Sequence, residues 1–219
     1  ANDIQSDGLT HSSIWCIVKD NQGTLWLGTY FGGVNYFNPE YEIYTRYSYS
    51  SNEKQGLSNP VVGRTIEDKN GNLWIGTEGG GLNYFNRRTR EFKWYRPQEG
   101  RNSISHNNVK ALYYDADKEI IWIGTHLGGM NRLDIRSGHF THYRMEDNNQ
   151  QTLPSDIVRD IIPYKDLLIV ATQNGVCLFE PDSGKCRQLF KDSKEGKSIK
   201  MVADILLDSE GTLWIAATG

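Results

Sequence analysis

Short runs of β-branched, aliphatic and aromatic residues alternate along the chain with clusters of Gly, Asn and Asp. Over residues 61–95 the runs fall at 61–66, 73–77, 82–86 and 91–95. Residues of these types favour β-strands, whereas Asp, Asn and Gly favour the tight turns that join them. The pattern therefore predicts four short strands in this stretch, followed by a longer polar loop.

The second of these runs recurs along the whole chain as Leu-Trp-Ile-Gly-Thr or a variant of it. Trp26, Trp74 and Trp122 are each 48 residues apart, Ile169 follows after 47 residues and Trp214 after 45. A period of this length indicates a repeat array in which one structural unit stacks on the next. Four short strands per repeat are typical of a β-propeller blade.

The period predicts an all-β fold built from four-stranded antiparallel β-propeller blades, about four and a half in number, with eighteen strands. Such a set closes into a ring only if the last strand pair docks on the first blade. Because an open ring leaves an apolar face and a strand edge in water, we expect instead a piece of a larger propeller, or self-association. The repeats cover approximately residues 9–56, 57–103, 104–152 and 153–198, with an incomplete fifth at 199–219.

Tryptophan occupies the centre of the second strand in four of the five repeats. Both faces of a blade pack on neighbouring blades, so bulky apolar side chains are needed on both sides. Burying one such side chain contributes about 1.5–3 kcal/mol. We therefore predict a structural role in the core between blades, with stacking on a sugar as the alternative, for Trp26, Trp74, Trp122 and Trp214.

A small residue follows each of these positions two residues later in the chain. Glycine occupies the position in three repeats, and Ala171 and Ala216 replace it in the other two. Since alanine substitutes for glycine, the position requires small size and not an unusual backbone dihedral. We expect a neighbouring backbone to approach closely at Gly28, Gly76 and Gly124.

Composition and charge exclude several kinds of partner. The net charge of the 219-residue chain is −3 and no basic cluster stands out, which argues against binding to nucleic acid. The chain has no apolar run of about 18 residues and no signal peptide, so we expect membrane attachment only through segments outside it. The Gly-Gly pairs suit turns and do not open a helix, so the sequence predicts no nucleotide cofactor.

The histidines and cysteines form no recognisable metal or nucleophile pattern. His139 and His142 give a His-x-x-His spacing at a turn and a strand, and the other histidines are scattered. Cys177 and Cys186 flank a turn, and their register decides between a disulfide and two buried free thiols. The sequence therefore predicts no metal and no cofactor, and it leaves the disulfide open.

The repeated residues resemble a known family. Asp-x-x-Gly-x-Leu-Trp-Ile-Gly-Thr, followed by Gly-Gly-Leu-Asn and preceded by Leu-Ser or Leu-Pro, is similar to the two-component regulator propeller repeat. The third repeat departs from this pattern at its first turn, and the fourth lacks both the tryptophan and the turn glycine. The turn motif occurs at Asp20, Asp68 and Asp208, and the preceding pair at Leu57-Ser58 and Leu153-Pro154.

The resemblance implies that the chain is part of a seven-bladed propeller in the periplasmic sensor region of a Bacteroidetes hybrid two-component histidine kinase. It implies a sensor that recognises oligosaccharide and signals to a kinase through dimer geometry, in a parent protein anchored in the inner membrane. In that family, propellers occur in pairs, and a Y-shaped β-sandwich domain, a membrane helix and the kinase follow them.

A ligand site is expected where the loops differ between repeats while the strands do not. The turn between the second and third strands and the loop before each first strand emerge on the same face of a propeller, and such loops carry binding sites. Aromatic side chains there can stack on a pyranose ring while polar neighbours bond its hydroxyl groups. Alternatively, this rim is solvated or packs on another domain. The predicted ligand-binding residues are Tyr30, Phe31, Glu78, His126 and Gln173 in the turns, and His11, Asn59 and His106 in the loops.

Two other functions compete with ligand sensing. A sialidase-like glycan-active enzyme needs an arginine cluster and a tyrosine nucleophile with an acid partner. Arg64 and Arg159 sit at related strand positions, but the repeats supply no third arginine or paired acid. The sequence therefore predicts no catalytic residues. A non-catalytic protein-interaction scaffold is the second alternative, since propellers host many functions.

Overall fold

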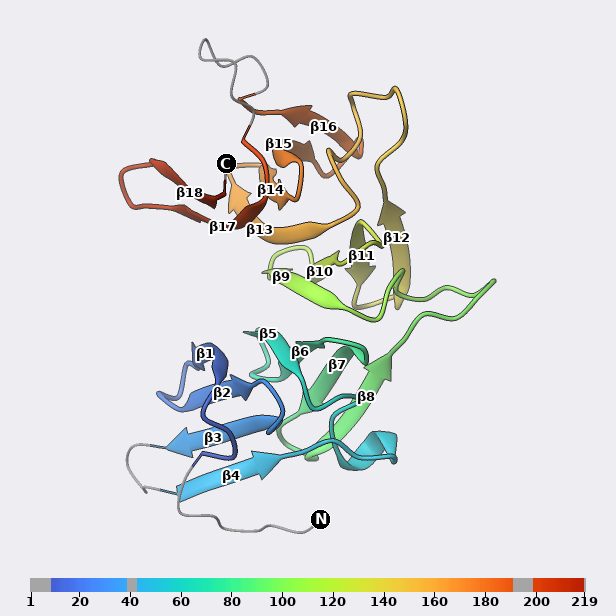
Figure 1. Ribbon diagram of the computed structural model, residues 1–219. Helices are drawn as coiled ribbons and strands as arrows, with labels where there is room; N and C mark the ends of the chain where they lie inside the picture. Colours follow the sequence, from blue (N-terminus) through green and yellow to red (C-terminus); the bar gives the residue numbers. More distant parts are fainter. Residues whose placement is uncertain (1–8, 39–42, 191–198, 219) are drawn as a thin grey trace. The chain divides into compact units, whose positions relative to one another are not determined.

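The computed structural model describes residues 9–38, 43–190 and 199–218. These residues form eighteen β-strands and one short 3₁₀ helix, η1 (Glu53–Gln55). The strands make four antiparallel sheets of four strands and one sheet of two. Figure 1 shows that each sheet is built from strands that follow one another along the chain. The predicted all-β fold of four-stranded blades is therefore confirmed.

The chain divides into two compact units between Val109 and Lys110. The first unit contains two complete sheets, in which every strand pairs antiparallel with the next. One sheet comprises β1 (Ile14–Lys19), β2 (Leu25–Thr29), β3 (Val34–Asn38) and β4 (Ile43–Tyr47), and the other β5 (Val62–Glu67), β6 (Leu73–Thr77), β7 (Gly81–Asn86) and β8 (Glu91–Tyr95).

The second unit continues the same meander pattern in two complete sheets and one strand pair. The predicted repeat boundaries at residues 198 and 219 lie outside the described residues, and the boundaries stay predictions. The strands are β9 (Val109–Asp115), β10 (Ile120–Thr125), β11 (Met130–Asp134), β12 (His139–Tyr143), β13 (Val158–Tyr164), β14 (Leu167–Thr172), β15 (Gly175–Glu180), β16 (Lys185–Gln188), β17 (Val202–Leu207) and β18 (Leu213–Ala217).

An aspartate closes the turn between the first and second strands in three sheets. The Asp20 carboxylate accepts hydrogen bonds from the backbone NH groups two and four residues later, both at 2.9 Å, and from the Trp26 indole NH at 2.8 Å. One carboxylate thus shapes the turn and orients the indole, which explains the Asp-x-x-Gly-x-x-Trp spacing. In the last strand pair, the hydrogen bond from the Trp214 indole NH is the largest cause that lowers the pKa of the Asp208 carboxyl below its ordinary value. The same bond joins Asp68 to Trp74 at 3.3 Å and Asp208 to Trp214 at 2.8 Å.

The core of each unit lies between successive sheets, with a tryptophan at its centre. In the first unit Trp26 packs with Val62 and Phe85 of the following sheet, and its ring meets the Phe85 ring edge-on with centroids 6.2 Å apart. In the second unit Trp122 packs against Phe179 in the same way, at 5.4 Å. The sheets are therefore joined by aromatic side chains that come from one sheet and insert against the next.

The predicted burial of the repeated tryptophans is confirmed at three positions and wrong at the fourth. Trp26 and Trp74 are each 2% exposed and Trp122 is 1% exposed, whereas Trp214 is 61% exposed. Alternate residues of a strand face opposite sides of the sheet. Leu213 and Ile215 face the preceding sheet and pack in its core, so Trp214 faces away from that core.

The small residues after the tryptophans admit a valine from the next sheet. A Cβ atom added to Gly28 would lie 2.7 Å from Val62 Cγ1, and one added to Gly124 would lie 2.6 Å from Val158 Cγ1. Close approach at these positions is confirmed, but the approaching group is a side chain and not the predicted backbone. Ala171 packs with Val202 at the equivalent place, where the spacing tolerates a methyl group.

The loop before β5 contains η1, which the pattern of the sequence does not predict. Glu53 accepts a hydrogen bond from the backbone NH of Trp94 at 2.5 Å, and the Trp94 indole NH donates to the Gly56 carbonyl at 2.9 Å. The partners lie 41 and 38 positions apart in the chain. Contacts with β8 therefore hold this turn in place, and no local sequence signal encodes them.

Cys177 and Cys186 on neighbouring strands are both buried free thiols. The hydrogen bond with Cys186, together with burial, raises the pKa of the Cys177 thiol well above its ordinary value. The structure thus decides the alternative that the sequence left open, in favour of two thiols. The described residues contain no helix with the length and apolarity that a membrane crossing requires.

Candidate functional site

In each unit, the candidate site is the rim formed by the turns between second and third strands and the loops before first strands. In the first unit the turn after β2 is bound to the loop before β1 by Tyr30 NH, which donates to the Ser13 carbonyl at 3.1 Å. The Thr10 hydroxyl also donates to the Gly32 carbonyl at 2.9 Å. Backbone contacts of this kind give the rim side chains a fixed base.

Four aromatic side chains gather on this rim, and we call His11, Trp15, Tyr30 and Phe31 the rim aromatic cluster. The Tyr30 ring lies 4.3 Å from the Phe31 ring and stacks on the Trp15 ring at 5.1 Å, as measured between centroids. His11 lies 6.4 Å from Tyr30 and 6.2 Å from Phe31. Trp15, Tyr30 and Phe31 are 48%, 37% and 57% exposed, so their faces are available to a ligand.

Sequence reasoning missed Trp15 as a member of this cluster. Its strand carries Cys16 and Val18 toward the core of the following sheet, so their neighbours Trp15 and Ile17 face the other way. The pairing of β1 with β2 is also irregular between Ile14 and Cys16, which places Trp15 in a bulge. The alternation could have shown that Trp15 faces outward, but its contact with Tyr30 depends on the bulge.

The three loop residues predicted as ligand contacts share one structural task. Each side chain accepts a hydrogen bond from the backbone NH two residues later and so turns the chain into the first strand of its sheet. One polar atom of each residue is therefore used by the loop itself. The bonds run from Ser13 to His11 Nδ1 at 3.0 Å, from Val61 to Asn59 Oδ1 at 2.9 Å, and from Asn108 to His106 Nδ1 at 3.0 Å.

The remaining predicted residues occupy the other turns of the rim and are half-buried. In the first unit Glu78 pairs with Asn108 through an isolated β-bridge. In the second unit His126 forms the same bridge with Ile157, and the Gln173 NH donates to the Ile157 carbonyl at 2.9 Å. The structure thus brings His126 and Gln173 together around one residue, and it groups His11, Tyr30 and Phe31 separately.

The arginine pair considered for glycan hydrolysis is not equivalent in the two sheets. Thr65 pairs with Ile75 and Ile161 pairs with Val170, which aligns Arg64 with Asp160, so Arg159 falls one residue out of register. The described residues also contain no group of three His, Cys, Asp or Glu side chains that could hold a metal ion. The described geometry therefore supplies no arrangement of groups with an obvious reaction.

Comparison with protein-family models finds three matches, at residues 8–31, 56–79 and 103–126, to the family described as two component regulator propeller. These segments are two component regulator propeller repeats. Each contains the loop before a first strand, the first turn and the tryptophan strand. The resemblance inferred from the repeated residues is confirmed.

Comparison with solved structures finds similar folds over nearly the whole chain. The extracellular domain described as that of the hybrid two component system BT3049 from B. thetaiotaomicron is 25% identical with a TM-score of 0.79, and the match covers 96% of this chain and 28% of that one. A one component system domain from the same organism is 24% identical with a TM-score of 0.75, over 94% of this chain and 28% of that one. PorZ of the type-IX secretion system of Porphyromonas gingivalis is 20% identical with a TM-score of 0.71, over 98% and 32%.

The chain spans about 28% of the length of the first two of these structures. The two structures that are 24% and 20% identical to this chain show a shared fold and nothing further. A search of curated protein sequences finds no match. The comparisons therefore support a propeller of the kind found in extracellular sensor domains, and they leave the ligand to be argued from the site.

Proposed function

We propose that this chain is a ligand-sensing segment of an extracytoplasmic propeller in a hybrid two-component sensor, and that it recognises an oligosaccharide. The matched repeats and the likeness to an extracellular domain of such a system support the sensor. The observation that carries the ligand is the rim aromatic cluster, because exposed aromatic rings grouped on a loop rim are uncommon without a binding role.

The chemistry of the cluster suits a sugar ring. The exposed parts of the Phe31 and Trp15 rings, with the edge of the Tyr30 ring that stacks on Trp15, offer apolar surface for the CH groups of a pyranose. The His11 ring beside them offers a polar group for a hydroxyl. Glu78, Asn59 and His106 in the same unit would contact further sugar units of a longer chain. His126 and Gln173 stay predicted ligand contacts on the rim of the second unit, taken by itself.

The signalling part of the proposal concerns the whole protein, of which this chain is a segment. We place the parent protein in the inner membrane with this propeller in the periplasm, as the extracellular domain of the similar system suggests. Oligosaccharide binding would change the geometry of a dimer and so the activity of a histidine kinase. Coupling of this kind requires that the ligand bind the two dimer geometries with different affinity.

A glycan array followed by calorimetric titration of the 219-residue chain tests the ligand. We expect one or more oligosaccharides to bind, and we expect Phe31→Ala to weaken that binding at least about tenfold because stacking on one ring contributes on the order of 1 kcal/mol or more. Leu127→Ala is the matched control, since Leu127 is an equally exposed apolar residue, at 56%, in the corresponding turn of another repeat.

Absence of binding to every oligosaccharide, or equal loss with Leu127→Ala, would remove the rim aromatic cluster from the proposal. If the chain instead captures a purified protein partner and Phe31→Ala abolishes that capture, the interaction scaffold replaces the sugar sensor.

A further inference from the structure

A pocket of about 380 Å³ lies in the first unit at the end of the sheets opposite the rim. It is bordered by the turn between β1 and β2, the turn between β5 and β6 and the turn between β7 and β8. Its wall includes Tyr36 and Tyr47, and its edge carries Arg87, Arg88 and Arg90. We call it the arginine pocket. No acidic side chain is among its described lining residues.

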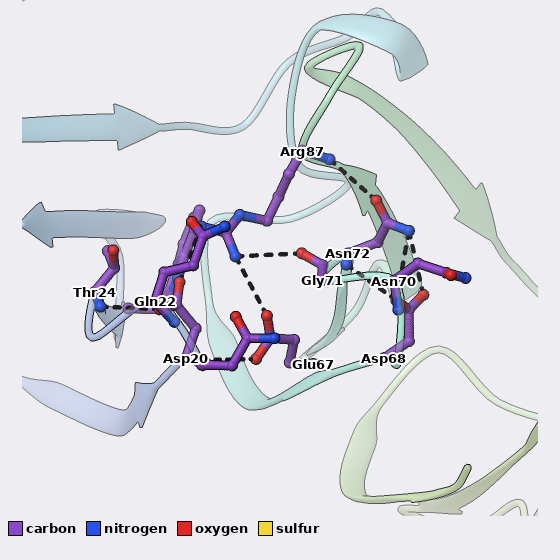
Figure 2. A network of polar contacts seen from close by, with 11 residues as sticks. Asp20, Gln22, Thr24, Glu67, Asp68, Asn70, Gly71, Asn72 and Arg87 are labelled. Atoms are coloured by element: carbon purple, nitrogen blue, oxygen red, sulfur yellow. Dashed lines mark hydrogen bonds and ion pairs between the residues drawn. The ribbon is translucent and has the colours of Figure 1, made fainter. Parts of the chain in front are cut away.

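Arg87 is the structural member of the three arginines. Its guanidinium lies 3.0 Å from Asp20 and 3.3 Å from Glu67, and it donates to the Gly71 carbonyl at 3.3 Å. Figure 2 shows the Arg87 side chain reaching between the turns of two successive sheets. It also lies over the Trp26 ring, at 5.2 Å from the centroid. Two carboxylates balance its charge, so Arg87 positions the pocket and leaves little charge for a ligand.

Arg88 and Arg90 carry the charge that is left. Both side chains are exposed, and neither makes an ion pair with any residue that the structure describes. Their turn is held at its base, because the Asn86 side chain accepts from the Arg88 NH at 3.0 Å and the Asn86 carbonyl accepts from the Arg90 NH at 2.8 Å. Two guanidinium groups therefore extend from a fixed turn at the mouth of a pocket.

The backbone of Arg90 is an independent sign that this residue has a role. Its φ is +58°, in the left-handed region that L side chains rarely adopt. The equivalent turns between third and fourth strands in the second unit place Gly138 and Gly184 there, with φ of +70° and +72°. Residues held in such conformations concentrate at functional sites. The positive φ of this turn favours glycine, but the first unit has an arginine at the position.

The second unit shows that the fold does not require this chemistry. A pocket of about 290 Å³ lies at the equivalent place between its first two sheets. There Trp122 and Tyr143 form the wall, but Pro181 and Asp182 stand where the first unit has Arg87 and Arg88. The second-unit pocket has cations of its own, Lys118 and Arg132, but they come from other positions of the repeat. The arginine-rich turn is thus a property of the first-unit pocket and not of the repeat.

We propose that the arginine pocket binds an anionic sugar unit of monosaccharide size, with its carboxylate held by Arg88 and Arg90. Guanidinium groups match the two oxygens of a carboxylate, which they bind through paired hydrogen bonds. The side chains of Gln22 and Thr45 line the same pocket and offer partners for hydroxyl groups, while half-buried Tyr36 and Tyr47 offer ring surfaces. The volume is near the lower end of those of small-molecule sites, which limits the ligand to a small unit.

Calorimetric titration of the 219-residue chain with glucuronate, galacturonate, glucose and inorganic sulfate, at low ionic strength, tests the proposal. We expect a uronate to bind with an affinity that falls as salt is added, while glucose does not bind. The double variant Arg88→Gln, Arg90→Gln should lose at least about tenfold in affinity, because both charged hydrogen-bond donors are removed. Both residues are exposed, and an unchanged urea midpoint will show that the variant is folded.

Arg101→Gln, Arg187→Gln is the matched control, because it removes two exposed arginines elsewhere and gives the same net charge. It should keep uronate affinity within about twofold. Phe31→Ala should also keep it, which separates this pocket from the rim. The proposal fails if no uronate binds, if glucose binds equally, if sulfate binds as tightly as the uronates, or if the control variant loses as much affinity as the pocket variant.

Discussion

The pockets in the two units lie beside equivalent sets of three packed rings, and their polar edges differ. In both, three rings meet at nearly the same separations: the tyrosine and phenylalanine centroids are 4.6 Å apart in the first unit and 4.8 Å in the second, and the tryptophan lies 6.3 Å and 5.9 Å from the tyrosine. These shared rings join successive sheets, so their composition is constrained by packing. The two sets are Trp26, Tyr47 and Phe85, and Trp122, Tyr143 and Phe179.

The polar edges differ in a correlated way. In the first unit the buried Asp20 carboxylate pairs with Arg87 of the following sheet, and this ion pair joins the two sheets. In the second unit Ala116 stands six residues before the tryptophan, so no buried carboxylate requires a cation, and Pro181 takes the place of the arginine. A buried charge without a partner of opposite charge destabilises the fold. The packing of the three rings depends neither on the carboxylate nor on the arginine. The comparison distinguishes the ring packing that both pairs of sheets share from the Asp20–Arg87 ion pair that the first pair carries in addition.

The largest expected effect tests the shared rings. Trp26→Ala and Trp122→Ala should each lower the free energy of unfolding by about 3–5 kcal/mol, because each leaves a cavity between two sheets. Urea denaturation followed by circular dichroism measures both. Trp214→Ala is the control, and since this side chain is exposed it should cost less than about 1 kcal/mol. Equal losses at all three positions would contradict the difference in burial.

The next effect tests the polar edge of the first unit. Arg87→Ala should lower the free energy of unfolding by about 3 kcal/mol, because it leaves the buried Asp20 and the largely buried Glu67 without their cation. Asp182→Ala in the second-unit pocket should change it by no more than about 0.5 kcal/mol. Chemical denaturation at pH 7 distinguishes the two. A loss below 1 kcal/mol for Arg87→Ala would show that the network is not linked to stability.

A smaller effect of opposite sign tests Arg90. Arg90→Gly should raise the free energy of unfolding by about 1 kcal/mol, because glycine adopts the positive φ of this turn without strain. The same variant should weaken uronate binding. Gly138→Arg in the second unit is the reciprocal change, and it should lower stability by a similar amount. A destabilised Arg90→Gly variant would mean that the arginine is there for packing.

The smallest expected effect concerns thiol chemistry. Burial raises the pKa of Cys16, and the bond with Cys186 together with burial raises that of Cys177, so the fraction of thiolate stays low as the pH rises from 7 to 9. We expect iodoacetamide to modify Cys16 first, since it is only half-buried, and to leave the other two thiols intact in the folded chain. Mass spectrometry of the digested chain at pH 7 and pH 9 measures this. Rapid modification of Cys177 at pH 9 would contradict its raised pKa.

The two candidate sites differ in how far the sequence alone could reveal them. The rim residues could be proposed from the sequence because they sit in loops that differ between repeats, and their role in binding stays a prediction. In the sequence, Arg87, Arg88 and Arg90 are three arginines of one turn, and nothing in the pattern gave them a role. The sequence does not show that carboxylates from two other segments neutralise Arg87, while Arg88 and Arg90 pair with no carboxylate in the part of the chain that the structure describes. That distinction depends on which turns of neighbouring sheets meet.

The sequence by itself determined the strands, their order and the three buried tryptophans, because strand propensity, turn residues and a period of 45–48 residues are local or repeating properties of the chain. Only the tertiary structure decided that Trp214 is exposed, that Trp15 joins the rim aromatic cluster and that valine fills the space beside Gly28. It also decided that Arg88 and Arg90 line one pocket without an ion pair to any described residue. Each of these depends on a neighbour that folding supplies from a different strand, turn or sheet. A periodic pattern specifies what each repeat is, but burial and charge balance are set by what each repeat touches.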